Sequence, residues 1–91
     1  MESIMQTEKR CFYCGRTTNL ECHHVFGGPN RQLSEQYGLK IWLCHEHHNE
    51  PPYGIHFNKT FRMVVQRMAQ EDFERTYPRE SFKRIFGKNY K

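Results

Sequence analysis

The sequence feature that most constrains folding is a concentration of thiol and imidazole groups in residues 43–48, Leu-Cys-His-Glu-His-His. One thiol and three imidazoles among six residues make a poor core segment, because each polar group is costly to bury without a partner. The same groups are good metal ligands. Further ligands lie upstream, in the pair Cys11 and Cys14 and in the run Cys22-His23-His24. We therefore expect the chain to fold around bound metal.

Length and composition favour the same conclusion. Ninety-one residues allow one domain with a small hydrophobic core. Such a domain usually needs a staple, that is, a bound metal ion or disulfides that hold its segments together. With 36% hydrophobic and 26% charged residues, the chain is typical of a globular protein rather than a disordered one. We expect a flexible lead-in over residues 1–9, followed by one zinc-stapled α+β domain over residues 10–91.

The four cysteines could instead form two disulfides. Residues 1–10 lack the apolar segment of a secretory signal, and a Cys-x-x-Cys pair with a histidine-rich partner favours metal ligation in a reducing cytoplasm. No apolar run approaches the length that spans a membrane, so we expect no membrane association.

Alternation and turn residues predict four elements in the middle of the chain. They are a strand within residues 19–26, a turn over 27–30, a turn of helix over 31–37 and a second strand over 39–43. In the first strand His23 and His24 would point to opposite faces, because side chains alternate along a strand. One histidine could then bind metal while the other meets solvent or substrate.

Three helices are predicted after the second strand. A short one begins near His45 and ends at Pro51-Pro52, since proline donates no backbone hydrogen bond. A longer one starts near His56, and its core-facing stripe is Phe57, Phe61, Val64, Val65, Met68 and Phe73. Pro78 at the first turn and Gly87 past the end bracket a last helix, whose docking residues are Phe82, Ile85 and Phe86.

The ligands are numerous enough for two metal sites. A structural zinc site closes its shell with four ligands, and we assign to it two knuckles of equal spacing, namely Cys11, Cys14, Cys44 and His47. Cys22 and His45 are possible substitutes. The remaining histidines, His23, His24, His48 and His56, are candidates for a second, open site. A structural alternative stays open for two of them: His56 as a helix-terminal residue and His24 as a hydrogen-bonded strand residue.

The net charge of +4 indicates a polyanionic partner, and its distribution is more informative than its size. From Arg79 to Lys91 there are five basic residues against the single acid Glu80. The nucleic-acid contacts predicted in this region are Lys83, Arg84, Lys88 and Lys91.

These motifs resemble the HNH, or ββα-metal, endonuclease family. The resemblance covers roughly Cys11 to His56 and rests on Cys11-x-x-Cys14-Gly15, Leu20-Glu21-Cys22-His23-His24-Val25 and Leu43-Cys44-x-x-His47-His48-Asn49. It implies that His23 binds a divalent ion, that His24 is the general base, and that His48 completes the metal site. The tail Phe86 to Tyr90 is similar to small phage-borne members, including recombination-promoting nucleases, which implies the cytoplasm of a bacterial or phage-infected cell.

The implied activity is metal-dependent hydrolysis of DNA phosphodiester bonds, leaving 5′ phosphate and 3′ hydroxyl ends. The substrate would be double-stranded DNA, with little intrinsic sequence specificity or with specificity borrowed from a partner protein. The catalytic ion could be Mg²⁺, Mn²⁺, Ni²⁺ or Zn²⁺, because histidine ligands suit the last three better while substrate oxygens can complete a magnesium shell.

The sequence departs from the family pattern at two positions. Gly38-Leu39 stands where members commonly have an asparagine that orients the base, and the nearest replacements are Asn30 and Asn49. Some members also have a metal histidine four residues after the one that corresponds to His48. Pro52 stands there and cannot ligate, so His56 is the alternative ligand.

Two other functions fit parts of the same pattern. A non-catalytic, zinc-stapled nucleic-acid-binding module explains the thiols and the charge, but leaves the adjacent strand histidines unexplained. A protein-interaction zinc domain also leaves the basic tail unexplained.

Overall fold

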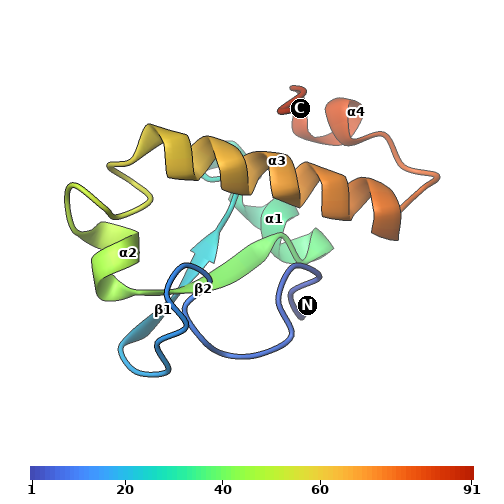
Figure 1. The fold of residues 1–91 in the computed structure, drawn as a ribbon. Coiled ribbons are helices and arrows are strands. Elements are labelled where there is room, and N and C mark those ends of the chain that lie inside the picture. The colour runs from blue at the N-terminus through green and yellow to red at the C-terminus, as the bar shows by residue number, and fades with distance from the viewer.

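A two-stranded hairpin lies beneath one long helix (Figure 1). The computed structural model describes residues 1–91. Its elements are β1 (Leu20–His24), η1 (Gly28–Asn30), α1 (Arg31–Tyr37), β2 (Lys40–Cys44), α2 (His45–Asn49), α3 (Lys59–Thr76) and α4 (Phe82–Phe86). The expected α+β architecture, with a short hairpin and C-terminal helices, is confirmed. None of the helices combines the length and the apolarity needed to cross a bilayer.

The two strands pair antiparallel, with Leu20 opposite Cys44 and His24 opposite Lys40. Alternation along β1 buries His23 and leaves its neighbour His24 only partly covered. The buried face of β2 contributes Ile41 and Leu43 to the core. The two adjacent histidines therefore point to opposite faces of the hairpin, as the alternation predicts.

The N-terminal segment, predicted as a lead-in over residues 1–9, is hydrogen-bonded to β2. Ser3 Oγ donates to the carbonyl of Lys40 at 2.5 Å, and Trp42 N donates to Gln6 Oε1 at 2.8 Å. These bonds satisfy backbone groups on the outer edge of β2, which a two-stranded sheet otherwise leaves unpaired. The partners are side chains some 36 residues distant in sequence, so no local pattern could predict them.

Helix α3 begins at Lys59, later than predicted, because Asn58 caps it by accepting from Phe61 N at 3.0 Å. Its buried face also differs from the predicted stripe. The buried residues are Val65, Ala69, Gln70 and Phe73, whereas the exposed ones include Phe57, Val64 and Met68.

A polar residue can take a core position here because the C-terminal tail satisfies it. Gln70 Nε2 donates to Asn89 Oδ1, and Gln70 Oε1 accepts from Tyr90 N, both at 2.7 Å. Buried amides cost little once they are fully hydrogen-bonded. The spacing of apolar residues therefore does not predict the buried face of α3, because one of its members is the polar residue Gln70.

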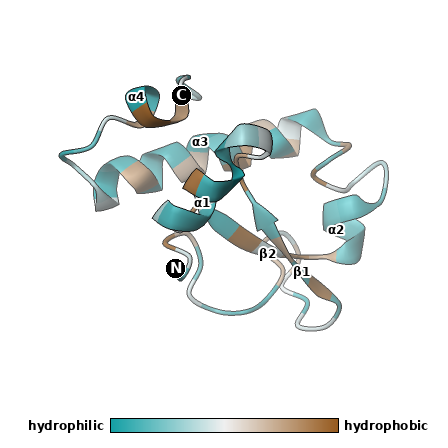
Figure 2. Ribbon diagram, turned by 180° about the vertical axis from the view of Figure 1, so that it is seen from behind, coloured by the Kyte–Doolittle hydropathy of each residue, from teal (hydrophilic) through white to brown (hydrophobic).

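Helix α4 docks on the domain through Phe82 and Phe86, which are both buried, as expected. Ser81, and not Pro78, begins it, because Ser81 Oγ accepts from Arg84 N at 3.2 Å. Gly87 ends it in the left-handed conformation with φ of 82°. Most of the ribbon is hydrophilic, and apolar stretches are concentrated on segments such as β2 and α4 (Figure 2).

Candidate metal centres

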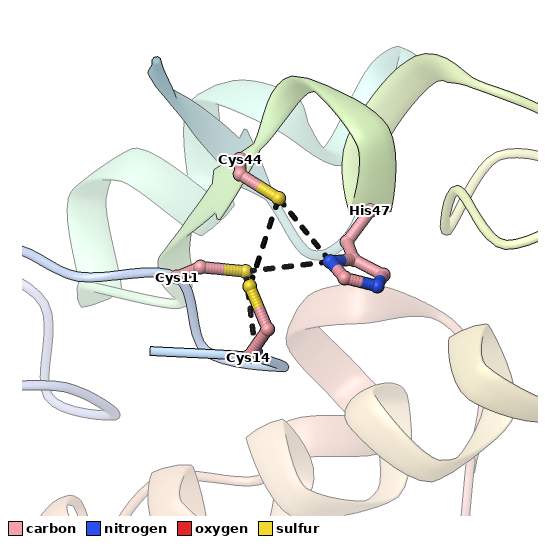
Figure 3. Close-up of side chains that lie close together, drawn as sticks. All are labelled: Cys11, Cys14, Cys44 and His47. Carbon is pink, nitrogen blue, oxygen red and sulfur yellow. Dashed lines mark hydrogen bonds between the residues drawn. The ribbon is translucent and has the colours of Figure 1, made fainter. Parts of the chain in front are cut away.

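Three cysteines and one histidine converge at the junction of β2 and α2 (Figure 3). They are the residues predicted for the structural zinc: Cys11, Cys14, Cys44 and His47. Cys14 Sγ lies 3.9 Å from Cys44 Sγ, and Cys44 Sγ lies 3.2 Å from His47 Nδ1. No disulfide joins the cysteines, and separations of this kind fit a tetrahedral ion whose thiolates and imidazole lie about 2.0 to 2.3 Å from it.

Each half of this Cys3His cluster is a local turn. Cys14 N points at Cys11 Sγ, 3.5 Å away, and Gly15 then takes a φ of 80°, as expected for the residue after a knuckle. In the second half, Cys44 is the last residue of β2 and His47 follows in the first turn of α2. Phe12 N donates to the carbonyl of Trp42 at 2.8 Å, which ties the first knuckle to β2.

The surroundings of Cys11 favour the thiolate that zinc requires. Burial raises the pKa of this thiol, but the backbone N–H groups of Cys44, Cys14 and Tyr13 together outweigh burial and lower the pKa to about 6. The donor set and its spacing therefore fit a structural zinc ion.

A second group of imidazoles, the His trio, is formed by His23, His48 and His56, whose ligand atoms lie within 4.8 Å of one another. His48 Nε2 is 3.1 Å from His56 Nε2. His23 Nε2 is the only buried side-chain nitrogen or oxygen without a hydrogen-bond partner. Such an orphan is rare in folded proteins and indicates a missing ion or water. Burial, followed by the charges of His48, His56 and His24, lowers the pKa of His23 to about 3, which keeps its lone pair available.

Glu21 orients one ring of the trio. Its carboxylate lies 2.7 Å from His48 Nδ1, which must donate because an ionised carboxylate only accepts. The Nε2 lone pair of His48 is then directed toward His23 and His56. Carboxylate–histidine pairs of this kind commonly support metal ligands. Asn49 also donates to Glu21, at 2.8 Å, and so supports His48 rather than His24.

His56 reaches the trio because residues 50–57 fold back on α2. Gly54 N donates to the carbonyl of Glu50 at 2.6 Å, and Ile55 N donates to that of His47 at 2.9 Å. The turn that folds this loop back on α2 requires glycine at position 54, because a Cβ on Gly54 would lie 2.7 Å from the Glu50 carbonyl oxygen. This loop places His56 beside His48, although Pro52 blocks the helical position.

His24 is held by a carboxylate that no sequence pattern identified. Its Nε2 lies 2.8 Å from Glu35 Oε1 of α1, while Asn30, one of the two expected asparagines, donates to the carbonyl of Phe86 instead. Hydrogen bonds from Lys40, His24 and the N-terminal amine lower the pKa of Glu35 to about 2, so the carboxylate is ionised and His24 Nε2 donates to it. In its neutral form His24 therefore carries its lone pair on Nδ1, for which the protein provides no partner.

No family model, curated protein or solved structure matches this chain.

The two remaining candidate ligands lie outside both clusters. Cys22 is exposed on β1, and His45 pairs with Glu21 at 2.9 Å. Of the predicted nucleic-acid contacts, Lys83 and Arg84 are exposed on α4, and Lys88 and Lys91 lie in the tail beyond it. Glu21 and Glu35 were missed because a lone glutamate in a strand or short helix carries no sequence signal for its partner. The nearest clue was that Glu21 lies in the same strand as both histidines.

The His trio fits an ion with an open coordination position. Two nitrogens bound to one tetrahedral ion are about 3.3 Å apart, close to the 3.1 Å between His48 and His56. His23 is buried, His48 is partly covered and His56 is exposed, so one side of the trio faces solvent. Three protein ligands with an accessible fourth position are typical of a catalytic site rather than a structural one.

Proposed function

We propose that this chain is a metal-dependent endonuclease of the HNH, or ββα-metal, type that hydrolyses phosphodiester bonds of double-stranded DNA. The observation that carries the proposal is the buried, unpartnered Nε2 of His23, on a ring that clusters with His48 and His56 so that one ligand atom of each residue lies within 4.8 Å of the others. The antiparallel hairpin followed by α2 supports it, because these elements bring a strand histidine and a helix histidine together.

The proposed general base is His24, which follows His23 on the same strand. Glu35 holds the ring in the tautomer with the proton on Nε2, so Nδ1 can take a proton from water. The hydroxide formed attacks phosphorus, the bond from phosphorus to the 3′ oxygen breaks, and that oxygen leaves with a proton from solvent. The ends are a 5′ phosphate and a 3′ hydroxyl.

A divalent ion held by His23, His48 and His56 would stabilise the negative charge that develops on the phosphate and on the leaving oxygen. Glu21 contributes by keeping the His48 ring in place. An all-imidazole ligand set favours Mn²⁺, Ni²⁺ or Zn²⁺ over Mg²⁺. The Cys3His cluster is separate from this chemistry and takes the structural zinc.

The test is nicking of supercoiled plasmid by the zinc-loaded chain with added Mg²⁺, Mn²⁺ or Ni²⁺. A positioned general base contributes about 10² to 10⁴ in rate, so His24→Ala should lower the nicking rate by at least about a hundredfold. Cys22→Ala is the matched control, since Cys22 lies two residues earlier on the same face of β1 and outside both clusters. The control should nick like the wild type, and both variants should keep their zinc and still melt cooperatively.

Two results would contradict the proposed nuclease activity. Nicking that persists unchanged in His24→Ala removes His24 from the reaction. DNA binding without any nicking, with a steep salt dependence, leaves the non-catalytic nucleic-acid-binding module.

A further inference from the structure

A basic groove runs between the first half of α3 and residues 88–91 of the C-terminal tail. Its volume is about 860 Å³. Five basic side chains and no acidic one line it, namely Lys59, Arg62, Arg67, Lys88 and Lys91. The two walls are far apart in sequence and are joined by the hydrogen bonds that the tail makes with Gln70.

Much of this positive charge is available to a ligand. Lys59 and Lys88 are exposed and have no carboxylate partner, and Lys88 Nζ lies 5.1 Å from the centroid of the Tyr90 ring. Arg67 and Lys91 each pair with one glutamate that lies outside the groove, at 3.8 and 2.6 Å. Five cations against two carboxylates leave an excess of positive charge along the groove.

The groove is also connected to the His trio. Arg62 Nη1 donates to the carbonyl of Ile55 at 3.1 Å, and Ile55 directly precedes His56. Arg62, which lines the groove, therefore contacts the residue next to the exposed member of the trio.

We infer that the groove binds the phosphate backbone of double-stranded DNA and directs it to the His trio. The inference deepens the proposed function, on which the choice of DNA as the ligand rests. A groove lined by five lysine and arginine side chains is complementary in charge to a phosphodiester chain, which carries one charge per nucleotide on each strand. Lys83 and Arg84 on α4 do not line this groove, so the expected basic tail contributes only its last residues.

The test is equilibrium binding of a fluorescent 20-base-pair duplex to the zinc-loaded full chain, measured by anisotropy across a salt series without any other divalent ion. The groove variant is Lys59→Gln with Lys88→Gln. The control variant is Lys83→Gln with Arg84→Gln, which also removes two positive charges, but from exposed positions outside the groove. Zinc content and melting temperature establish that both variants fold.

The groove variant should lower the slope of log K against log salt by about 0.9 for each phosphate that is no longer neutralised, or about 1.8 in total. At roughly 0.1 M salt this corresponds to a dissociation constant that is about ten to a hundred times larger. The control variant should change the affinity by less than about twofold. If the double variant folds poorly, Lys59→Gln and Lys83→Gln make the same comparison singly.

Equal losses of affinity in the two variants would overturn the inference, because they would reflect only the net charge of the molecule. Competition by polyglutamate as strong as that by unlabelled duplex would also overturn it, in favour of an acidic protein partner. Cleavage is not read in this experiment. A chain that binds DNA through the groove but never nicks plasmid would therefore contradict the proposed nuclease activity and still support the groove as a DNA-binding site.

Discussion

Two glutamates set the direction in which the candidate catalytic rings present their lone pairs. Glu21 accepts from His48 and Glu35 accepts from His24, each from the imidazole nitrogen that the proposed chemistry does not use. An imidazole has two nitrogens, and the hydrogen bond on one decides what the other can do. The function of each histidine therefore depends on a neighbour that looks unremarkable in the sequence.

Glu35→Gln should change how stability depends on pH. The pKa of Glu35 is lowered from an ordinary value near 4.5 to about 2, first by Lys40, then by His24 and the N-terminal amine. A carboxylate with a lowered pKa stabilises the fold above its unfolded pKa, and this contribution is lost as the pH falls from about 4.5 toward 2. We expect the variant to melt at a lower temperature than the wild type at neutral pH.

The measurement is the difference in melting temperature between wild type and Glu35→Gln as a function of pH. The difference should shrink as the pH falls below about 4.5. Zinc content is measured at each pH, and the two chains are compared only at pH values where both keep their zinc. A difference that already shrinks near pH 7 would mean that a group other than this carboxylate controls it.

At the scale of elements, α2 is a five-residue helix that takes part in both metal clusters. His47 faces the cysteines, where the Tyr13 ring stacks on it at 4.3 Å, and the next residue, His48, faces His23. A helix this short is not stable alone, so its geometry depends on what holds it. A metal ion bound by the Cys3His cluster on one side, and the loop that carries His56 on the other, would hold α2 in place.

Gly54→Ala tests that loop. The added Cβ would lie within 3.0 Å of backbone atoms of Glu50 and His48, so the loop must shift, at a cost of about 1 to 3 kcal/mol in the free energy of unfolding. Thermal melts should show the loss of stability. Calorimetric titration with Ni²⁺ should show weaker binding at the His trio, with the structural zinc retained.

Gly27→Ala is the control for this variant, because nothing lies within 4 Å of the added Cβ and the glycine has an ordinary negative φ. It should be close to neutral in both measurements. A Gly54→Ala chain with unchanged Ni²⁺ affinity would contradict the role of the loop in placing His56.

At the scale of the whole molecule, the stability of the fold is limited by the small size of its hydrophobic core. Only 18 of 91 residues are buried, and two of these, Cys11 and Cys44, belong to the Cys3His cluster. The zinc ligands therefore form part of the core itself. Structural zinc contributes about 10 to 16 kcal/mol in small zinc-binding peptides, whereas whole domains are stable by about 5 to 15 kcal/mol.

Removing the zinc should therefore unfold the chain. Circular dichroism during treatment with a strong chelator should show loss of helix and of the cooperative melt, and restoring zinc should restore both. Cys44→Ser should behave like the metal-free chain, while Cys22→Ser should behave like the wild type. A metal-free chain that still melts cooperatively would show that the apolar core suffices.

The parts of this protein that the sequence determined are those encoded by local spacing. Two cysteines three residues apart can bring both thiolates to one ion within a single tight turn, and adjacent strand residues such as His23 and His24 must face opposite ways. The hairpin, the short helix stopped by two prolines and the Cys3His ligand set could all be predicted for this reason.

Only the tertiary structure decided which distant groups meet. Glu35 beside His24, His56 beside His48, Gln70 in the core and the basic groove between α3 and the tail all depend on chain segments separated by many residues. These pairings follow from loop closure and from the packing of whole elements, and no periodicity along the chain records them. Sequence spacing therefore identified the ligands and the fold class, while packing selected the partners that orient them.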